Sequence, residues 1–185
     1  MQPPPDDDHA RLAEARAGDV DARAWLAERW TAPVYRFAYR MMGNEQDAHD
    51  ITQETLIKVL RHLDQYDPNR AFATWLFGIA RNTCVDEHRR RRRVSWDEPE
   101  ERELVDPTPS PLALADRAER SQKLTAALER LAPLYREVVV LYHFEHLKYV
   151  EIAEILDVPL GTVMNRIFRA RRKLRDLYEA EGGTG

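Results

Sequence analysis

The sequence predicts an all-α protein in which two small helical domains are joined by a flexible, acidic, proline-rich linker, the second domain containing a helix-turn-helix. Strong use of Leu, Ala, Arg and Glu, with only 7 glycines in 185 residues, favours helices over strands. Apolar residues recur at helical intervals through most of the chain. Residues 94–111 interrupt this pattern with four prolines and six acidic residues, which is typical of a solvated linker.

The first domain is expected at residues 9–93, the linker at 94–115 and the second domain at 116–180. Helices in the first domain are expected at residues 19–39, at 45–63, and from Trp75 into the arginines at 89–93. Pro33 is interpreted as a local break or helix start within the first of these. Gly43 and Asn44 end that stretch, and Thr74 is a candidate N-cap of the third helix.

The second domain is expected to contain four helices joined by short links, which is the pattern of a compact bundle. These helices are expected at residues 116–130, 133–144, 149–156 and 160–178. Pro133 and Pro159 support the second and fourth of them, because proline suits the start of a helix.

Charges are segregated along the chain, although the net charge is only -4. Arginines dominate residues 88–93 and 166–175, and acidic residues collect at 6–8, 47–54 and 97–106. Lys and Arg supply most of the non-specific affinity of a protein for DNA. We therefore expect weak DNA binding by the chain alone and a need for a protein partner.

The single cysteine, Cys84, cannot form an internal disulfide, and we interpret it as a small buried residue, with redox sensing as the alternative. The N-terminal segment is acidic and proline-rich, unlike a signal peptide. No apolar run approaches the ~18 residues that span a bilayer. A cytoplasmic protein that does not insert into the membrane is expected.

Residues 149–156, the turn 157–161 and the helix that follows have the length and turn content of a helix-turn-helix. The last helix carries one buried stripe, formed by Val163, Ile167, Ala170, Leu174 and Leu177. Its other faces carry Thr162, Asn165, Arg166, Arg169, Arg172 and Lys173. Such a helix fits a DNA major groove, where these side chains reach base edges or phosphates. A solvated charged face is the alternative.

Aromatic side chains stand beside the basic helix that begins near Trp75. Bases of single-stranded nucleic acid stack on aromatic rings while arginines follow the backbone. Phe72, Trp75 and Phe77 are equally compatible with an ordinary core, and for Trp75 core packing is favoured. Asn82 lies on the polar side of this helix, and for this residue contact with nucleic acid is at least as well supported as a structural role.

A third pattern lies on the helix expected at residues 45–63. Asp50, Gln53, Glu54 and Ile57 share one face at helical spacing. An acidic face with an apolar residue in it can dock a basic helical partner. Without further context, a solvated face is the favoured alternative.

Three segments resemble extracytoplasmic-function (ECF) RNA polymerase sigma factors. DAHDITQETLIKVLRHL at 47–63 is similar to the core-binding helix of that family, and WLFGIARNTCVDEHRRRRR at 75–93 to its promoter-melting segment. Residues 131–174 resemble its C-terminal domain. The resemblance covers roughly residues 12–180, and its motifs occur in the family's order.

The resemblance implies a bacterial sigma factor that binds core RNA polymerase and directs promoter recognition and transcription initiation. The surface expected against the clamp helices of the largest polymerase subunit is Asp47, Asp50, Gln53, Glu54 and Ile57. The residues expected at the -10 element are Asn69, Arg70, Phe72, Trp75, Asn82, Asp86, Arg89 and Arg90. Those expected at the -35 element are Thr162, Asn165, Arg166, Phe168, Arg169, Arg172 and Lys173.

An anti-sigma factor is a further partner that the resemblance implies, besides polymerase and promoter DNA. Met164 and Asn165 stand where many members have a basic residue and a serine, so the promoter sequence is not carried over from the family.

Catalysis and cofactors are not expected. No nucleophile with a paired base, glycine-rich phosphate loop or carboxylate dyad stands out. His143 and His146 could face each other, but a third metal ligand is missing from the pattern, so no metal is expected. The competing function is a one-component helix-turn-helix regulator. It leaves the aromatic and arginine-rich segment unexplained, and such regulators usually need a dimer to match paired half-sites.

Overall fold

The computed structural model describes residues 8–94 and 124–180, and every regular element in these two stretches is a helix. The predicted all-α class is therefore confirmed. The linker expected at 94–115 lies outside the described residues except for Val94, and the domain boundaries stay a prediction.

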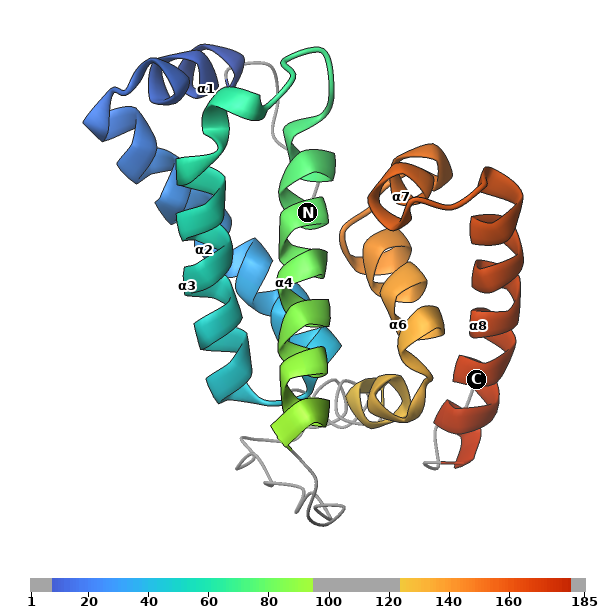
Figure 1. Ribbon diagram of the computed structural model, residues 1–185. Helices are drawn as coiled ribbons and strands as arrows, with labels where there is room; N and C mark the ends of the chain where they lie inside the picture. Colours follow the sequence, from blue (N-terminus) through green and yellow to red (C-terminus); the bar gives the residue numbers. More distant parts are fainter. Residues whose placement is uncertain (1–7, 95–123, 181–185) are drawn as a thin grey trace, which may run out of the picture.

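The N-terminal group of helices places three long helices side by side, with a short one across their end (Figure 1). The elements are α1 (Asp8–Ala17), α2 (Val20–Met42), α3 (Glu45–Arg61), the 3-10 turn η1 (Leu63–Gln65) and α4 (Phe72–Val94). Two side chains cap the starts of α2 and α3. Asp19 accepts a hydrogen bond from Ala22 N at 2.8 Å, and Asn44 accepts one from Asp47 N at 2.8 Å.

The expected break at Pro33 is wrong, because α2 runs through this residue without interruption. Proline in a helix interior removes a hydrogen bond and costs about 3 kcal/mol. Trp30, Val34 and Phe37 lie around Pro33 and are buried in the core. Their packing offsets the local cost.

The expected cap at Thr74 is also wrong. Helix α4 begins earlier, at Phe72, and the carbonyl of Ala71 accepts hydrogen bonds from Thr74 N and Trp75 N. Thr74 is therefore inside the first turn, where its hydroxyl is buried and has no hydrogen-bond partner. The earlier start carries the ring of Phe72 into the core.

The C-terminal group follows the expected helix-turn-helix. Residues 124–130 are helical, and α6 (Pro133–Val139) continues as a π-helical turn, η2 (Val140–Phe144). Helices α7 (Tyr149–Leu156) and α8 (Leu160–Ala180) come next. Asp157 makes the turn between them in the left-handed conformation, at φ 51°.

One apolar cluster runs through both helix groups. Phe37, Leu26 and Ile51 fill its N-terminal part, and Val163 and Ile167 of the predicted stripe fill its C-terminal part. The two groups also contact each other, α4 against α7 and α2 against α6 and η2. The orange helices α6 and α7 consequently lie beside the green α4, and the red α8 lies on their far side (Figure 1).

Gly43 ends α2 in a conformation that other residues avoid, with φ +77°, and a Cβ added to it would lie 2.9 Å from Oε1 of Glu129. We expect Gly43→Ala to lower the free energy of unfolding by about 1–2 kcal/mol in urea titrations. Gly78→Ala is the matched control, because a Cβ at this mid-helix position meets nothing within 4 Å. It should raise stability by up to about 1 kcal/mol. Equal changes in the free energy of unfolding for the two variants would show that the backbone conformation and close contact at Gly43 do not make a Cβ costly there.

Candidate nucleic-acid and partner interfaces

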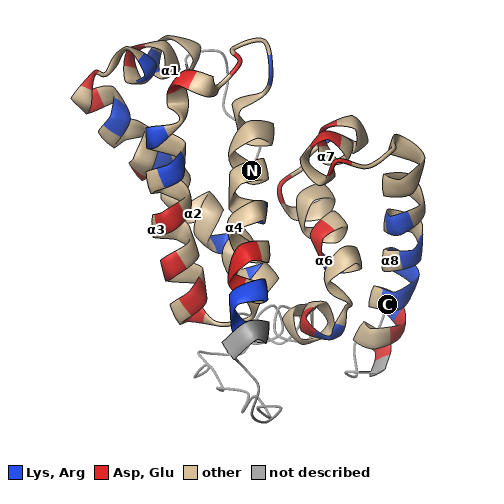
Figure 2. Cartoon of the chain, viewed as in Figure 1, with Lys and Arg blue, Asp and Glu red and all other residues tan. Residues whose placement is uncertain are grey.

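Helix α8 presents a basic face to solvent over its C-terminal half (Figure 2). Its buried stripe holds Val163, Ile167 and Ala170 against the rest of the bundle, so the opposite side points outward. Exposed residues on that side are Asn165, Phe168, Arg169, Arg172 and Lys173. Phe168, an apolar residue among them, is 73 % exposed. The helix therefore brings together five of the seven residues expected at a DNA duplex.

The other two, Thr162 and Arg166, are half-buried. Arg166 donates from Nη1 to Oε1 of Glu137 at 3.2 Å. Its guanidinium is thus turned toward α6, and in this arrangement a carboxylate competes with DNA for it.

Glu137 is a buried acid that sequence reasoning missed. Its side chain accepts from Arg166 and, through Oε2, from Nε of Arg81 on α4 at 3.2 Å. Burial raises the pKa of Glu137, and the two guanidinium groups act in the opposite direction. The sequence did contain a signal for this pairing. An acid within the apolar run of α6 is expected to be buried, and buried charges in proteins are paired.

The polar side of α4 carries Asn82 and Asp86 on the surface, followed by exposed arginines. Asn82 Oδ1 accepts from Nη1 of Arg81 at 3.3 Å. Arg89 faces Asp86 at 4.0 Å, and Arg90 faces Glu87 at 2.9 Å. The side chains of Arg89 and Arg90 are 70 % and 74 % exposed, so both remain within reach of a nucleic-acid backbone.

The aromatic residues of this region belong to the core. Phe72 is 7 % exposed, and its ring centroid lies 5.5 Å from Trp30, 5.2 Å from Tyr66 and 5.7 Å from Trp75. Trp75 is half-buried, and Phe77 is buried. The structure therefore favours the core interpretation for Phe72 and Phe77, whereas Trp75 is partly exposed to solvent.

The loop before α4 holds Asn69 and Arg70 on the surface. Asp67 accepts hydrogen bonds from the backbone N and the side-chain Nδ2 of Asn69, each at 3.0 Å, and these bonds lower the pKa of Asp67. Arg70 pairs with Glu154 of α7 at 3.6 Å. The loop is thereby ordered next to the start of α4.

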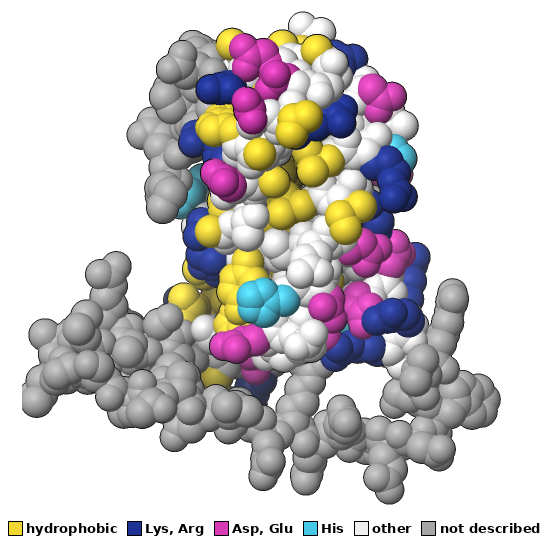
Figure 3. Space-filling model, turned by 90° about the vertical axis from the view of Figure 1, so that its left-hand side faces the viewer, with side chains coloured by type: hydrophobic (Ala, Val, Ile, Leu, Met, Phe, Trp, Pro, Cys, Tyr) yellow, Lys and Arg dark blue, Asp and Glu magenta, His cyan; other side chains and the backbone are white. Residues whose placement is uncertain are grey.

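Helix α3 exposes four of the five residues expected at the polymerase, namely Asp50, Gln53, Glu54 and Ile57. Ile57 is 55 % exposed. Acidic residues lie along α3 in Figure 2, and Figure 3 shows acidic and hydrophobic side chains next to one another on this side of the molecule.

Asp47, the fifth residue, is placed differently. It is 4 % exposed and bonds with the side chains of Asn44 and Arg91. In this arrangement it holds α3 against α4 and is not part of the exposed face. Arg91 correspondingly has a structural contact, unlike the exposed Arg89.

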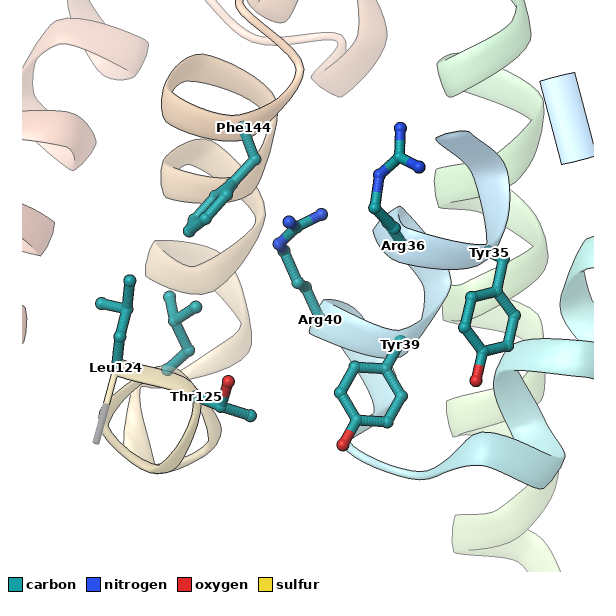
Figure 4. Close-up of a pocket in the computed structure, with 8 residues that line it drawn as sticks. Tyr35, Arg36, Tyr39, Arg40, Leu124, Thr125 and Phe144 are labelled. Carbon is teal, nitrogen blue, oxygen red and sulfur yellow. The ribbon is translucent and has the colours of Figure 1, made fainter. Parts of the chain in front are cut away.

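A pocket of about 190 Å³ lies where α2 meets the C-terminal group (Figure 4). Arg40 reaches into this seam and lies over the ring of Phe144, 4.1 Å from its centroid. Arg40 also pairs with Glu145 at 3.6 Å, which is too long for a hydrogen bond. Burial is the main reason why the pKa of Glu145 rises to about 7.

The raised pKa of Glu145 predicts a pH dependence of stability. In the unfolded chain Glu145 ionises near 4.5, whereas in the folded chain it stays protonated until about 7. The folded state binds more protons between these values, so its free energy of unfolding falls as the pH rises through this window. Urea titrations should show that the free energy of unfolding of Glu145→Gln, relative to that of the unaltered chain, rises by up to roughly 3 kcal/mol between pH 5 and pH 8. Glu179→Gln, at an exposed site, should show no such trend, and a constant offset for Glu145→Gln would refute the burial argument.

Cys84 is 2 % exposed, and burial raises the pKa of its thiol to about 12. The thiolate is the reactive form of cysteine, so this residue is poorly suited to redox sensing.

In the described stretches, no three His, Cys, Asp or Glu side chains are placed to hold a metal ion. His143 Nε2 lies 3.3 Å from Nε of Arg171, and burial together with Arg171 and His146 lowers the pKa of His143. Residues 8–94 and 124–180 also contain no helix long and apolar enough to cross a membrane.

Two family models match the chain. The model described as Sigma-70 region 2 matches residues 26–94, and the model described as Sigma-70, region 4 matches residues 121–174. The first match contains α3 and α4 with their exposed faces, and the second contains the helix-turn-helix.

Characterised relatives cover most of the chain. The ECF RNA polymerase sigma factor SigW of Bacillus subtilis is 34% identical over 89% of this chain and 93% of its own. The ECF RNA polymerase sigma factor SigE of Mycolicibacterium smegmatis is 44% identical over 77% of this chain and 56% of its own.

Two solved structures share the fold. CnrH, in complex with the cytosolic domain of CnrY, superposes with a TM-score of 0.69 at 29% identity, covering 95% of this chain and 99% of that one. The sigma factor RpoE of Bartonella quintana, in complex with the anti-sigma factor NepR, gives 0.70 at 26% identity, covering 87% and 97%.

Proposed function

The chain belongs to the ECF RNA polymerase sigma factors and directs promoter-specific transcription initiation, and we propose that α3, α4 and α8 divide this work between three surfaces. The observation that carries the proposal is that one chain exposes a basic face on α8 and, separately, an acidic face on α3 that contains Ile57. A one-component regulator needs only the first of these.

The outward face of α8 would bind the -35 duplex in the major groove. Asn165 and Arg169 are exposed near its N-terminal half, where a recognition helix contacts base edges. Arg172 and Lys173 lie one turn further along and would contact phosphates. Arg166 would join the base-reading set once Glu137 releases it.

Helix α4 and the preceding loop would capture the non-template strand at the -10 element. Asn82 offers an amide to a flipped base, and Asp86 lies one turn away on the same side. Arg89 and Arg90 would follow the backbone, and Asn69 and Arg70 would line the approach from the loop. Trp75 is half-buried, and its exposed part would contact a base beside Asn82.

The exposed face of α3 would bind the clamp helices of the largest polymerase subunit. Acidic side chains around Ile57 suit a basic helical surface with an apolar contact at its centre. The polymerase supplies all the chemistry, and this chain supplies binding energy for selection and melting. We infer that it is not an enzyme and that it acts in the cytoplasm, where its polymerase is.

An anti-sigma factor is a further proposed partner. Both CnrH and RpoE were solved as complexes, the second with a protein named as an anti-sigma factor. Their similarity to this chain supports a partner of the same kind.

The -35 assignment is tested by Arg169→Ala, measured as affinity for a duplex that carries the promoter of this protein. Loss of a base contact costs about 1–3 kcal/mol, so affinity should fall roughly 5- to 150-fold. Arg175→Ala is the control, since it removes an exposed arginine from the far end of the same helix. If both variants lose affinity equally, Arg169 contributes charge alone and the assignment fails.

A further inference from the structure

Helix α8 carries an exposed apolar stripe along one flank of its outward side. Leu160, Met164 and Phe168 follow one another at intervals of four residues, so they are neighbours on the helix surface. Their exposed fractions are 42 %, 52 % and 73 %. Large apolar side chains that are exposed next to one another on a protein surface mark an interaction site. We call these three residues the α8 stripe.

The α8 stripe lies directly beside polar residues that suit DNA. Asn165 follows Met164 in the sequence, and Arg169 follows Phe168, so each polar side chain lies about 100° further round the helix than its apolar neighbour. Asn165 and Arg169 are both exposed. The outward side of α8 is therefore divided lengthwise into an apolar half and a polar half.

Charge favours DNA over a protein as the molecule that covers the stripe. Arg169, Arg172 and Arg175 are exposed along the same stretch of α8, and an apolar protein surface would not neutralise them. A polyanion that also presents an apolar group meets both requirements. Duplex DNA is such a molecule, because thymine carries a methyl group at its major-groove edge.

The position of the stripe along the helix agrees with contacts to bases. The first turns of α8, up to Asn165, contain no charged residue, and the basic residues lie further along (Figure 2). The N-terminal part of a recognition helix contacts base edges, whereas positive side chains bind phosphates. Met164 is in the part of α8 that reaches bases, and Phe168 is one turn further on.

The chemistry of the two side chains selects among the four bases. An aromatic ring makes apolar contact with the thymine methyl, and the flexible thioether of methionine adapts to such a group. The other three bases lack this methyl. Their polar edges would lose water against Met164 and Phe168 without gaining a hydrogen bond, which is unfavourable. The stripe thus favours thymine and disfavours its competitors.

We propose that Met164 and Phe168 read thymine methyl groups in the major groove, so that the element bound by α8 places thymine beside the bases contacted by Asn165 and Arg169. This inference rests on the proposed function of α8 as the reader of the -35 duplex. It adds Met164 to the base-reading residues and gives the element a base identity.

Replacement of thymine by uracil tests the proposal, because it removes the methyl group and leaves the hydrogen-bonding groups of the base unchanged. The full chain selects duplexes from a random pool, and the enriched element is synthesised with uracil in place of each thymine in turn. Fluorescence anisotropy then measures the affinity of the unaltered chain for each duplex. Uracil should weaken binding about threefold to fourfold at each position that contacts the stripe.

Two variants assign the effect to the stripe. Met164→Ala and Phe168→Ala should each bind the thymine duplex more weakly and lose the difference between thymine and uracil at one position. Val20→Ala is the control, since it shortens an exposed apolar side chain on α2, and it should keep both the affinity and the difference.

Equal affinities of the unaltered chain for thymine and uracil duplexes would overturn the proposal, and this comparison does not depend on how a variant folds. A selected element without thymine, or a pool without any enriched sequence, would overturn it as well. So would a uracil effect that persists in both variants.

These measurements do not need the polymerase. If the chain failed to direct transcription while uracil still weakened binding, the proposed function would be wrong and thymine reading by α8 would stand. If transcripts appeared while thymine and uracil duplexes bound equally, the proposed function would stand and thymine reading would be wrong.

Discussion

Asn82→Ala is expected to reduce promoter opening by about tenfold or more while leaving binding to core polymerase unchanged. The amide of Asn82 is exposed on the polar side of α4 and is held by Arg81 at 3.3 Å, so it is oriented before a base arrives. A lost base-edge contact costs about 1–3 kcal/mol, and 1.4 kcal/mol is a factor of ten. Permanganate reactivity of unpaired thymines in the -10 region measures the effect.

The control for this prediction is Gln65→Ala, which removes an exposed amide from η1 in the same helix group. It should leave the permanganate pattern as it is in the unaltered protein. An unchanged pattern in Asn82→Ala would show that this amide does not capture a base.

The second large effect is expected from Ile57→Glu on α3. Ile57 is the exposed apolar residue within the acidic face, and the substitution replaces an apolar contact with a charge that would be buried without a partner. Central interface residues of this kind cost 2 kcal/mol or more when lost. Affinity for core polymerase should fall at least about thirtyfold, measured by fluorescence anisotropy of the labelled chain.

Val20→Glu is the matched control for Ile57→Glu, because Val20 is 77 % exposed on the same helix group but lies on α2. It should bind core polymerase as tightly as the unaltered chain. Equal losses in the two variants would mean that added negative charge, and not the α3 face, lowers affinity.

Elements set by local periodicity could be predicted from the sequence. The stripe of Val163, Ile167 and Ala170 places one side of α8 in the core, and this alone determines that Asn165 and Arg169 point outward. The acidic face of α3 followed from spacing in the same way.

Features that depend on partners far along the chain could not be predicted. Asp47 is buried because Arg91, 44 residues away, bonds to it, and Glu137 is paired with Arg81 across 56 residues. The spacing of residue types along the sequence does not show which residues so far apart will pair. The continuity of α2 through Pro33 likewise depends on tertiary packing, which outweighs a local preference.

Run-off transcription distinguishes a sigma factor from a one-component regulator. The purified chain is added to sigma-free bacterial core polymerase on a library of promoter-like duplexes. We expect discrete transcripts that require both the chain and the core, and that disappear with Ile57→Glu. Absence of transcripts and of co-migration with core on gel filtration, together with sequence-specific binding to duplex DNA by the chain alone, would contradict this expectation and support a one-component regulator.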